Sequence, residues 1–183
     1  MKKYGFYLIV MLVALFAATG SSCSDDNDDH LNEWMVANQL ALNAIKANPE
    51  YKELRSPGNE GSVYYKVLTK GDGTDPIYYT STVTCYYKGW FVADYPKYSI
   101  ENGTVFDQKL FDDGTPYSFL VGATGSSAVI NGWKTALQNM VKGDKWEVWI
   151  PYQLGYGREG SSNGSIPGYS VLVFEIEVMT VSE

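Results

Sequence analysis

Residues 128–157 read AVINGWKTALQNMVKGDKWEVWIPYQLGYG, and residues 165–179 read SIPGYSVLVFEIEVM. The first segment opens as a short amphipathic helix, whose apolar positions, Trp133 among them, follow helical spacing. Gly143 stands where a left-handed residue is expected to end that helix. Alternating apolar residues then predict two strands, which are joined by a Gly/Ser-rich loop that begins near Tyr156.

The period of two also runs through other parts of the chain. Apolar side chains recur at every second position in residues 63–67, 82–87, 146–150 and 172–178. Clean alternation of this kind is typical of an antiparallel sheet with one face in solvent. Together with one short helix at about residues 132–141, it predicts an α+β domain.

The first 22 residues have the features of a targeting segment. Lys2 and Lys3 provide a basic start, an apolar run follows, and small residues precede Cys23. The apolar run is shorter than the roughly 20 residues of a membrane span. We therefore expect residues 1–22 to be a signal peptide that resembles those of bacterial lipoproteins, with a secretory signal cleaved nearby as the alternative. A lipid on Cys23 would anchor the protein in the cell envelope, as an outer-membrane lipoprotein on the periplasmic or surface face.

Three segments are expected after the signal. Residues 23–30 form an acidic tether, and residues 31–56 carry an extended helical pattern that Asn48 and Pro49 interrupt. We expect this N-terminal helix to pack on its own domain; an arm that faces a partner is the alternative. A turn-rich stretch then marks the start of a domain over residues 62–183.

Composition excludes several function classes. The net charge of −7 argues against nucleic acid, because phosphate binding needs clustered Lys and Arg. The single histidine, His30, lies in the acidic tether without ligands at metal-site spacing, so no metal site is expected. The glycine-rich segments lack the Lys and Ser/Thr of a phosphate-binding loop. Cys85 alternates with apolar residues, which indicates a buried structural thiol.

An ordered series of short motifs over residues 62–181 resembles the FKBP-type peptidyl-prolyl isomerase family. Each motif alone is weak evidence, but the order of the whole set is specific. The motifs are YYKG at 86–89, NGTVFD at 102–107, FLVG at 119–122, VINGW at 129–133, MVKG at 140–143, IP at 150–151, LGYG at 154–157, IP at 166–167 and LVF at 172–174. The resemblance implies a twisted antiparallel β-sheet wrapped around one short α-helix, with a proline-binding pocket between them.

The resemblance also implies roles for individual residues. Trp133 would form the floor beneath the prolyl ring of a substrate, Tyr156 would bind a substrate carbonyl, and Asp107 would orient polar groups at the pocket edge. The backbone N–H of Ile130 would bind a second carbonyl, and Ile166 would belong to a loop that folds over the peptide. The remaining walls would be Tyr87, Phe106, Tyr117, Val129, Ile130 and Phe174.

The implied activity is isomerisation of Xaa–Pro bonds in envelope or secreted proteins. Resonance makes rotation about a peptide bond cost about 18–20 kcal/mol. A pocket that prefers the twisted amide lowers this barrier without covalent chemistry, so neither cofactor nor metal is expected. Proline-containing polypeptides are the expected partners. The alternative is a proline-binding or chaperone module whose catalysis is weak or lost, and the sequence leaves the oligomeric state open.

The chain departs from the compact family members in three places. Residues 90–105 and 123–128 are longer, and Ser165 replaces an aliphatic residue. Lys109 is the candidate for the basic residue that pairs with Asp107 in many family members. Because these changes border the expected pocket, we expect them to alter peptide preference.

Overall fold

A computed structural model describes residues 26–92 and 103–183, with the side chains of residues 26–30 left out. Residues 33–183 form one compact unit. The expected signal peptide, Cys23 and the middle of the 90–105 loop lie outside the described residues. None of the described helices combines the length and apolar character that crossing a membrane requires.

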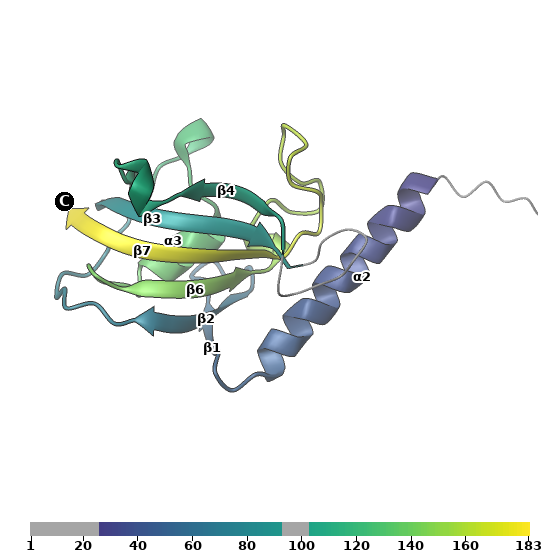
Figure 1. The fold of residues 1–183 in the computed structure, drawn as a ribbon, viewed down its shortest axis with the longest axis horizontal. Coiled ribbons are helices and arrows are strands. Elements are labelled where there is room, and N and C mark those ends of the chain that lie inside the picture. Colours follow the sequence, from purple (N-terminus) through teal and green to yellow (C-terminus); the bar gives the residue numbers. More distant parts are fainter. Residues whose placement is uncertain (1–25, 93–102) are drawn as a thin grey trace, which may run out of the picture. The chain divides into compact units, whose positions relative to one another are not determined.

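The described strands form one seven-stranded antiparallel sheet (Figure 1). Its order is β1-β2-β6-β7-β3-β4, and β5 pairs with β3 beside β4. The bounds are β1 Lys52–Arg55, β2 Ser62–Thr69, β3 Thr82–Phe91, β4 Val105–Lys109, β5 Tyr117–Leu120, β6 Lys145–Ile150 and β7 Leu172–Ser182. One edge of β3 therefore has two partners: β5 pairs with its first half and β4 with its second half.

The main core lies between the sheet and the short helix α3, Asn131–Leu137. Trp133, Leu137 and Met140 are all buried, as their helical spacing predicted. The helix is shorter than expected, and Gly143 does not end it. Gly143 does have a positive φ of 87°, but it lies in the turn before β6, where its N–H donates to the Val178 carbonyl. The predicted α+β class is confirmed.

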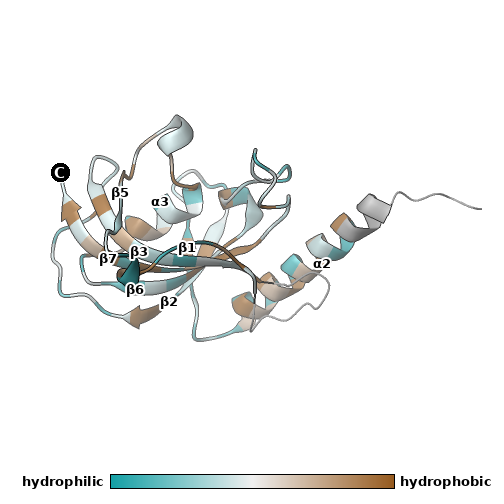
Figure 2. Ribbon diagram, turned by 45° about the horizontal axis from the view of Figure 1, so that its top comes forward, coloured by the Kyte–Doolittle hydropathy of each residue, from teal (hydrophilic) through white to brown (hydrophobic). Residues whose placement is uncertain are grey.

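The long helix α2, Asp26–Ala47, covers part of the opposite face of the sheet from residue 34 onward. Apolar and polar residues alternate in bands along it (Figure 2). Trp34, Leu42 and Ile45 pack in a second apolar cluster with Trp149 and Val173 of the sheet. The expectation of a sheet with one face in solvent is therefore wrong for β6 and β7, which bury side chains on both of their faces. The preferred expectation, a helix packed on its own domain, is confirmed.

The boundaries of this helix also differ from expectation. It begins at Asp26, inside the predicted tether, and ends at Ala47. Residues 52–55 form β1 and belong to the sheet, although the predicted helical segment extended to residue 56. The physical reason is Pro49, which disfavours the helical conformation of Asn48 before it. The Asn48 side chain instead accepts a hydrogen bond from the Glu50 N–H and stabilises a turn.

Candidate active site

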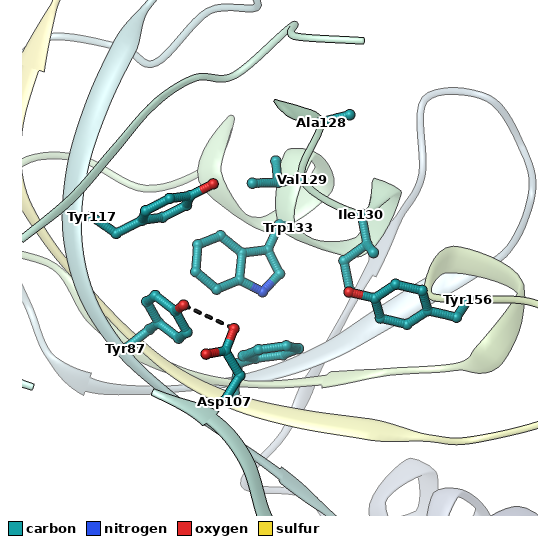
Figure 3. A pocket seen from close by; sticks show the side chains of 9 residues that line it. Tyr87, Asp107, Tyr117, Ala128, Val129, Ile130, Trp133 and Tyr156 are labelled. Carbon is teal, nitrogen blue, oxygen red and sulfur yellow. Dashed lines mark hydrogen bonds between the residues drawn. The ribbon is translucent and has the colours of Figure 1, made fainter. Parts of the chain in front are cut away.

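A pocket opens where α3 faces the edge of the sheet at which β4 and β5 meet. Each neighbouring element contributes a side chain that points into it (Figure 3). The space, including its open mouth, is about 460 Å³. The lining residues are Tyr87 of β3, Asp107 of β4, Tyr117 of β5, Ala128, Val129 and Ile130 before α3, Trp133 of α3, Tyr156, and Phe174 of β7.

Trp133 forms the base of the pocket. Its indole ring is enclosed edge-to-face by Tyr87, with ring centroids 5.1 Å apart, and by Phe174 at 5.2 Å. Phe119 packs against a further side of the indole at 5.7 Å. Edge-to-face contacts of this kind fix the orientation of an aromatic ring. The indole is therefore held rigidly, with its remaining free surface towards the pocket.

Asp107 and Tyr87 form the polar edge of the pocket. The Tyr87 hydroxyl donates a hydrogen bond of 2.9 Å to Asp107 Oδ2. Burial, and then this bond to a carboxylate, raise the pKa of Tyr87, so its hydroxyl keeps its proton. Gly89 pairs with Asp107 across the strands. A Cβ on Gly89 would lie 2.6 Å from the Phe174 ring and 2.8 Å from the Phe106 ring, so its absence lets both rings pack against the β3 backbone.

Tyr156 faces Asp107 from the other side of the pocket (Figure 3). It follows the 3₁₀ helix η4, Tyr152–Leu154, and the next residue, Gly157, has a positive φ of 69°. The Gly157 N–H donates to the Tyr152 carbonyl and closes this turn. Desolvation, followed by the negative charge of Asp107, raises the pKa of Tyr156. The phenol is therefore a neutral hydrogen-bond donor at physiological pH.

Ile130 offers a second donor, from its backbone. It is the N-cap of α3 and has an extended conformation, φ −61° and ψ 154°. Its carbonyl accepts hydrogen bonds from Trp133 and Lys134, but among the described residues no acceptor is found for its N–H. Ile130 lies directly before α3 and lines the pocket together with Trp133. Its N–H is the group for which the resemblance implied a bond to a substrate carbonyl.

The structure brings eight of the ten predicted pocket residues together, and the other two, Phe106 and Ile166, are not among the residues that line the pocket. Phe106 does not line the pocket; it supports the Phe174 ring from behind at 5.4 Å. Ile166 is buried in the main core, so the expectation that it covers the peptide finds no support in its position. Ala128 lines the pocket but was not predicted, because a small residue before a helix carries no distinctive signal. The described contacts give Asp107 the Tyr87 hydroxyl as a partner, not Lys109.

Comparison with known proteins identifies the family. The family described as FKBP-type peptidyl-prolyl cis-trans isomerase matches residues 75–179, which is more than half of the chain. The chain belongs to this family. The matched segment contains every FKBP pocket residue named above, whereas α2, β1 and β2 lie before it.

Relatives of known name agree with the assignment. The chain is 36% identical over 122 residues to the FKBP-type 22 kDa peptidyl-prolyl cis-trans isomerase of Escherichia coli; the match covers 67% of this chain and 51% of that relative. This FKBP chain thus spans about half the length of that relative. It is 33% identical over 123 residues to the FK506-binding protein of Neisseria meningitidis, covering 67% of this chain and 99% of the relative.

A solved structure supports the fold. The peptidyl-prolyl cis-trans isomerase of Pseudomonas syringae pv. tomato has a TM-score of 0.63 and 33% sequence identity to this chain. The comparison covers 83% of this FKBP chain and 96% of that one. Within the described residues, no group of three or more His, Cys, Asp or Glu is arranged to hold a metal ion.

Proposed function

We propose that this FKBP protein catalyses the cis–trans isomerisation of Xaa–Pro bonds in polypeptides. The observation that carries the proposal is the aromatic enclosure of Trp133 by Tyr87 and Phe174, with Asp107 and Tyr156 on opposite sides of its mouth. A prolyl ring is compact, apolar and of a size that such an enclosure accepts. Among the described lining residues, Asp107 alone carries a charge.

The pocket suits the electronic change that rotation requires. A planar amide is polar, because resonance places negative charge on oxygen and positive charge on nitrogen, and twisting the C–N bond removes this resonance. Water stabilises the planar form, so a pocket that replaces water with aromatic rings favours the twisted form relative to solution. The Tyr156 hydroxyl and the Ile130 N–H would hold the flanking carbonyls while the bond between them rotates.

Trp133→Ala and Asp107→Val test this function. The first change removes the base of the pocket, and the second leaves the Tyr87 hydroxyl without its acceptor. We expect each to lower kcat/KM on an Xaa–Pro tetrapeptide by about tenfold or more, the scale on which misplaced binding groups affect rate. Asp112→Val, on the exposed 3₁₀ helix η2, Phe111–Asp113, is the matched control and should retain the wild-type rate. A wild-type chain that binds the peptide without accelerating isomerisation would instead support the proline-binding or chaperone module.

We further propose that the protein is lipidated at Cys23 and resides at the cell envelope, acting on envelope or secreted polypeptides. The basic start, the apolar run and the small residues before Cys23 support this. Mass spectrometry of the N-terminal peptide should find a lipid on Cys23, and Cys23→Ser should move the protein from the membrane to the soluble fraction. An unmodified Cys23, or cleavage at another position, would contradict the proposal.

A further inference from the structure

Helix α2 precedes the segment matched to the FKBP family, yet its buried face reaches two segments that carry the polar groups of the pocket. Trp34 is 7% exposed and Asn38 is 1% exposed. Each of these side chains forms a buried hydrogen bond to a residue more than 130 positions later in the chain. Buried long-range hydrogen bonds fix the relative position of the two segments that they join.

The first route leads from α2 to Tyr156. The Trp34 Nε1–H donates to the Gly168 carbonyl at 3.1 Å. The next residue, Tyr169, donates its N–H to the Gly157 carbonyl at 3.0 Å, and Gly157 directly follows Tyr156. This bond closes the base of the loop between η4 and β7.

The base of this loop is tightly packed. A Cβ on Gly168 would lie 1.8 Å from the Arg158 carbonyl oxygen. The backbones of the two ends of the loop are therefore in direct contact. Asn38 secures the end of the loop, because its Oδ1 accepts the Val171 N–H at 2.7 Å. The Asn38 amide also donates to the Trp34 carbonyl at 2.9 Å, which orients it. A shift of α2 at Trp34 would therefore be transmitted to the backbone beside Tyr156.

The second route leads from the same indole to Asp107. The Trp34 ring packs edge-to-face on Phe91, with centroids 5.5 Å apart. Phe91 packs on Phe106 at 4.9 Å, and Phe106 directly precedes Asp107. Phe91 contacts both apolar clusters, the main core and the one beneath α2. One side chain on α2 thus supports the two polar residues that face each other across the pocket.

We propose that Trp34, assisted by Asn38, is a positioning residue that sets the separation of Tyr156 and Asp107 and so governs the isomerase rate. This role rests on the proposed function, because it is exerted through that same pocket. In this role α2 contributes to the catalytic rate in addition to burying one face of the sheet.

Trp34→Phe in the full chain, purified in detergent micelles, tests the role. Phenylalanine keeps an aromatic ring beside Phe91 but cannot donate to Gly168. We expect kcat/KM for an Xaa–Pro tetrapeptide to fall about tenfold, with most of the loss in kcat. Hydrogen exchange of the Tyr169 amide should become faster, since the loop base is loosened. Asn38→Ala is the second variant and should produce both effects without altering the indole.

Ile45→Ala is the matched control. Ile45 is buried in the same cluster beneath α2, so its truncation weakens the helix–sheet contact without removing either long-range hydrogen bond. It should lower Tm while leaving kcat/KM within about twofold of wild type, measured well below Tm. Equal rate losses in Ile45→Ala and Trp34→Phe, or wild-type kcat/KM in both Trp34→Phe and Asn38→Ala, would overturn the role. A wild-type chain without isomerase activity would instead refute the proposed function. If hydrogen exchange of the Tyr169 amide were then also unchanged in Trp34→Phe and Asn38→Ala, the positioning role of Trp34 would be refuted as well.

Discussion

Glycine determines the pocket at positions where a side chain would displace the rings or backbone around it. Gly89 leaves room for the Phe106 and Phe174 rings, and Gly168 allows the backbones at the two ends of the η4–β7 loop to come into contact. Neither residue has the positive φ that would otherwise explain a glycine. Both are therefore required for close approach and not for backbone conformation.

Gly168→Ala should destabilise the protein and impair the site together. A Cβ at this position meets the Arg158 carbonyl, so the loop base must open. We expect a loss of about 1–3 kcal/mol in the free energy of unfolding, as for other overpacked positions, and a fall in kcat/KM because Tyr156 shifts. Urea denaturation and the peptide assay measure the two effects. Gly58→Ala, whose Cβ would make ordinary contacts, should change neither; a stable and fully active Gly168→Ala would contradict this view of the loop.

The buried thiol of Cys85 should make stability depend on pH. Burial raises its pKa from the ordinary 9.0 to about 12. Above pH 9 the unfolded chain loses this proton while the folded chain keeps it. The contribution is therefore complete below pH 9 and is lost as pH rises towards 12, with a slope of at most about 1.4 kcal/mol per pH unit.

Chemical denaturation between pH 9 and pH 10 measures this effect. The tyrosines begin to titrate in the same interval, and burial also raises the pKa of several of them, so the contribution of the thiol is the difference between wild type and a Cys85 variant. The free energy of unfolding of wild type should fall across this interval. Cys85→Val keeps a buried apolar side chain of similar size and should show a flatter dependence. Parallel slopes for the two proteins would exclude Cys85 as the source.

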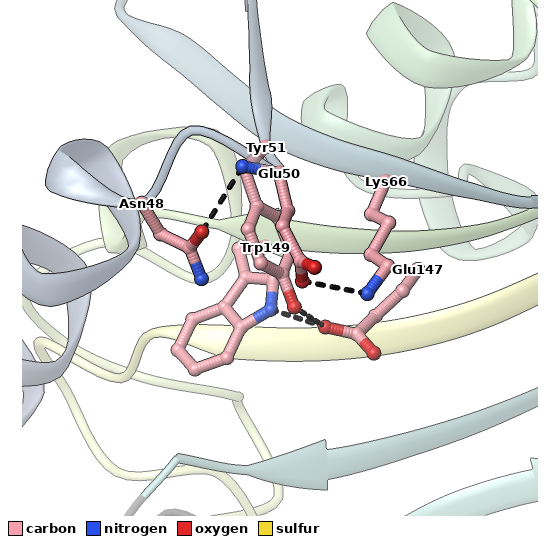
Figure 4. A network of polar contacts seen from close by, with 6 residues as sticks. All are labelled: Asn48, Glu50, Tyr51, Lys66, Glu147 and Trp149. Atoms are coloured by element: carbon pink, nitrogen blue, oxygen red, sulfur yellow. Dashed lines mark hydrogen bonds and ion pairs between the residues drawn. The ribbon is translucent and has the colours of Figure 1, made fainter.

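At the scale of elements, the segment between α2 and β1 is tied to the outer face of β6 (Figure 4). Glu147 accepts hydrogen bonds from the Tyr51 hydroxyl and from Trp149 Nε1. Burial, and then the bond to Glu147, raise the pKa of Tyr51, so this donor stays protonated. Lys66 of β2 pairs with Glu50 at 2.8 Å and adds an exposed contact to the same segment.

Glu147→Ala should destabilise the protein more than its position on a partly exposed sheet face suggests. Removing this carboxylate leaves two donors without their acceptor, which costs about 1–3 kcal/mol. Glu175→Ala is the matched control on the neighbouring strand, because its ion pair with Lys145 is partly exposed and worth less than about 1 kcal/mol. Thermal or urea unfolding of both variants gives the comparison, and equal losses would contradict the importance of the network.

At the scale of the whole described chain from residue 33, two apolar clusters lie on opposite faces of one sheet and share Phe91. We therefore expect a single unfolding transition, in which far-UV circular dichroism and tryptophan fluorescence coincide. Trp34→Ala should lower the free energy of unfolding by about 3–5 kcal/mol, as for other large core truncations. A separate early transition of the helix would show that α2 unfolds independently of the sheet.

Much of the fold and the pocket could be predicted from local patterns. Alternation located the strands around Val83, Trp146 and Ile176, and helical spacing located Trp133. The ordered motifs assigned eight residues that the structure gathers in one pocket. Phe106 and Ile166 are not among the residues that line the pocket, and their roles towards a peptide stay predictions, because a motif shows that a residue is near a site but not which neighbours surround it.

The sequence by itself determined the alternation of the strands, the amphipathic helix that carries Trp133 and the membership of the FKBP family, because these depend on residues close together in the chain. Only the tertiary structure decided that α2 covers Trp149 and Val173, and that its Trp34 bonds to Gly168. Those contacts join segments more than 100 residues apart, and no local periodicity encodes which distant surface an apolar helix face will meet.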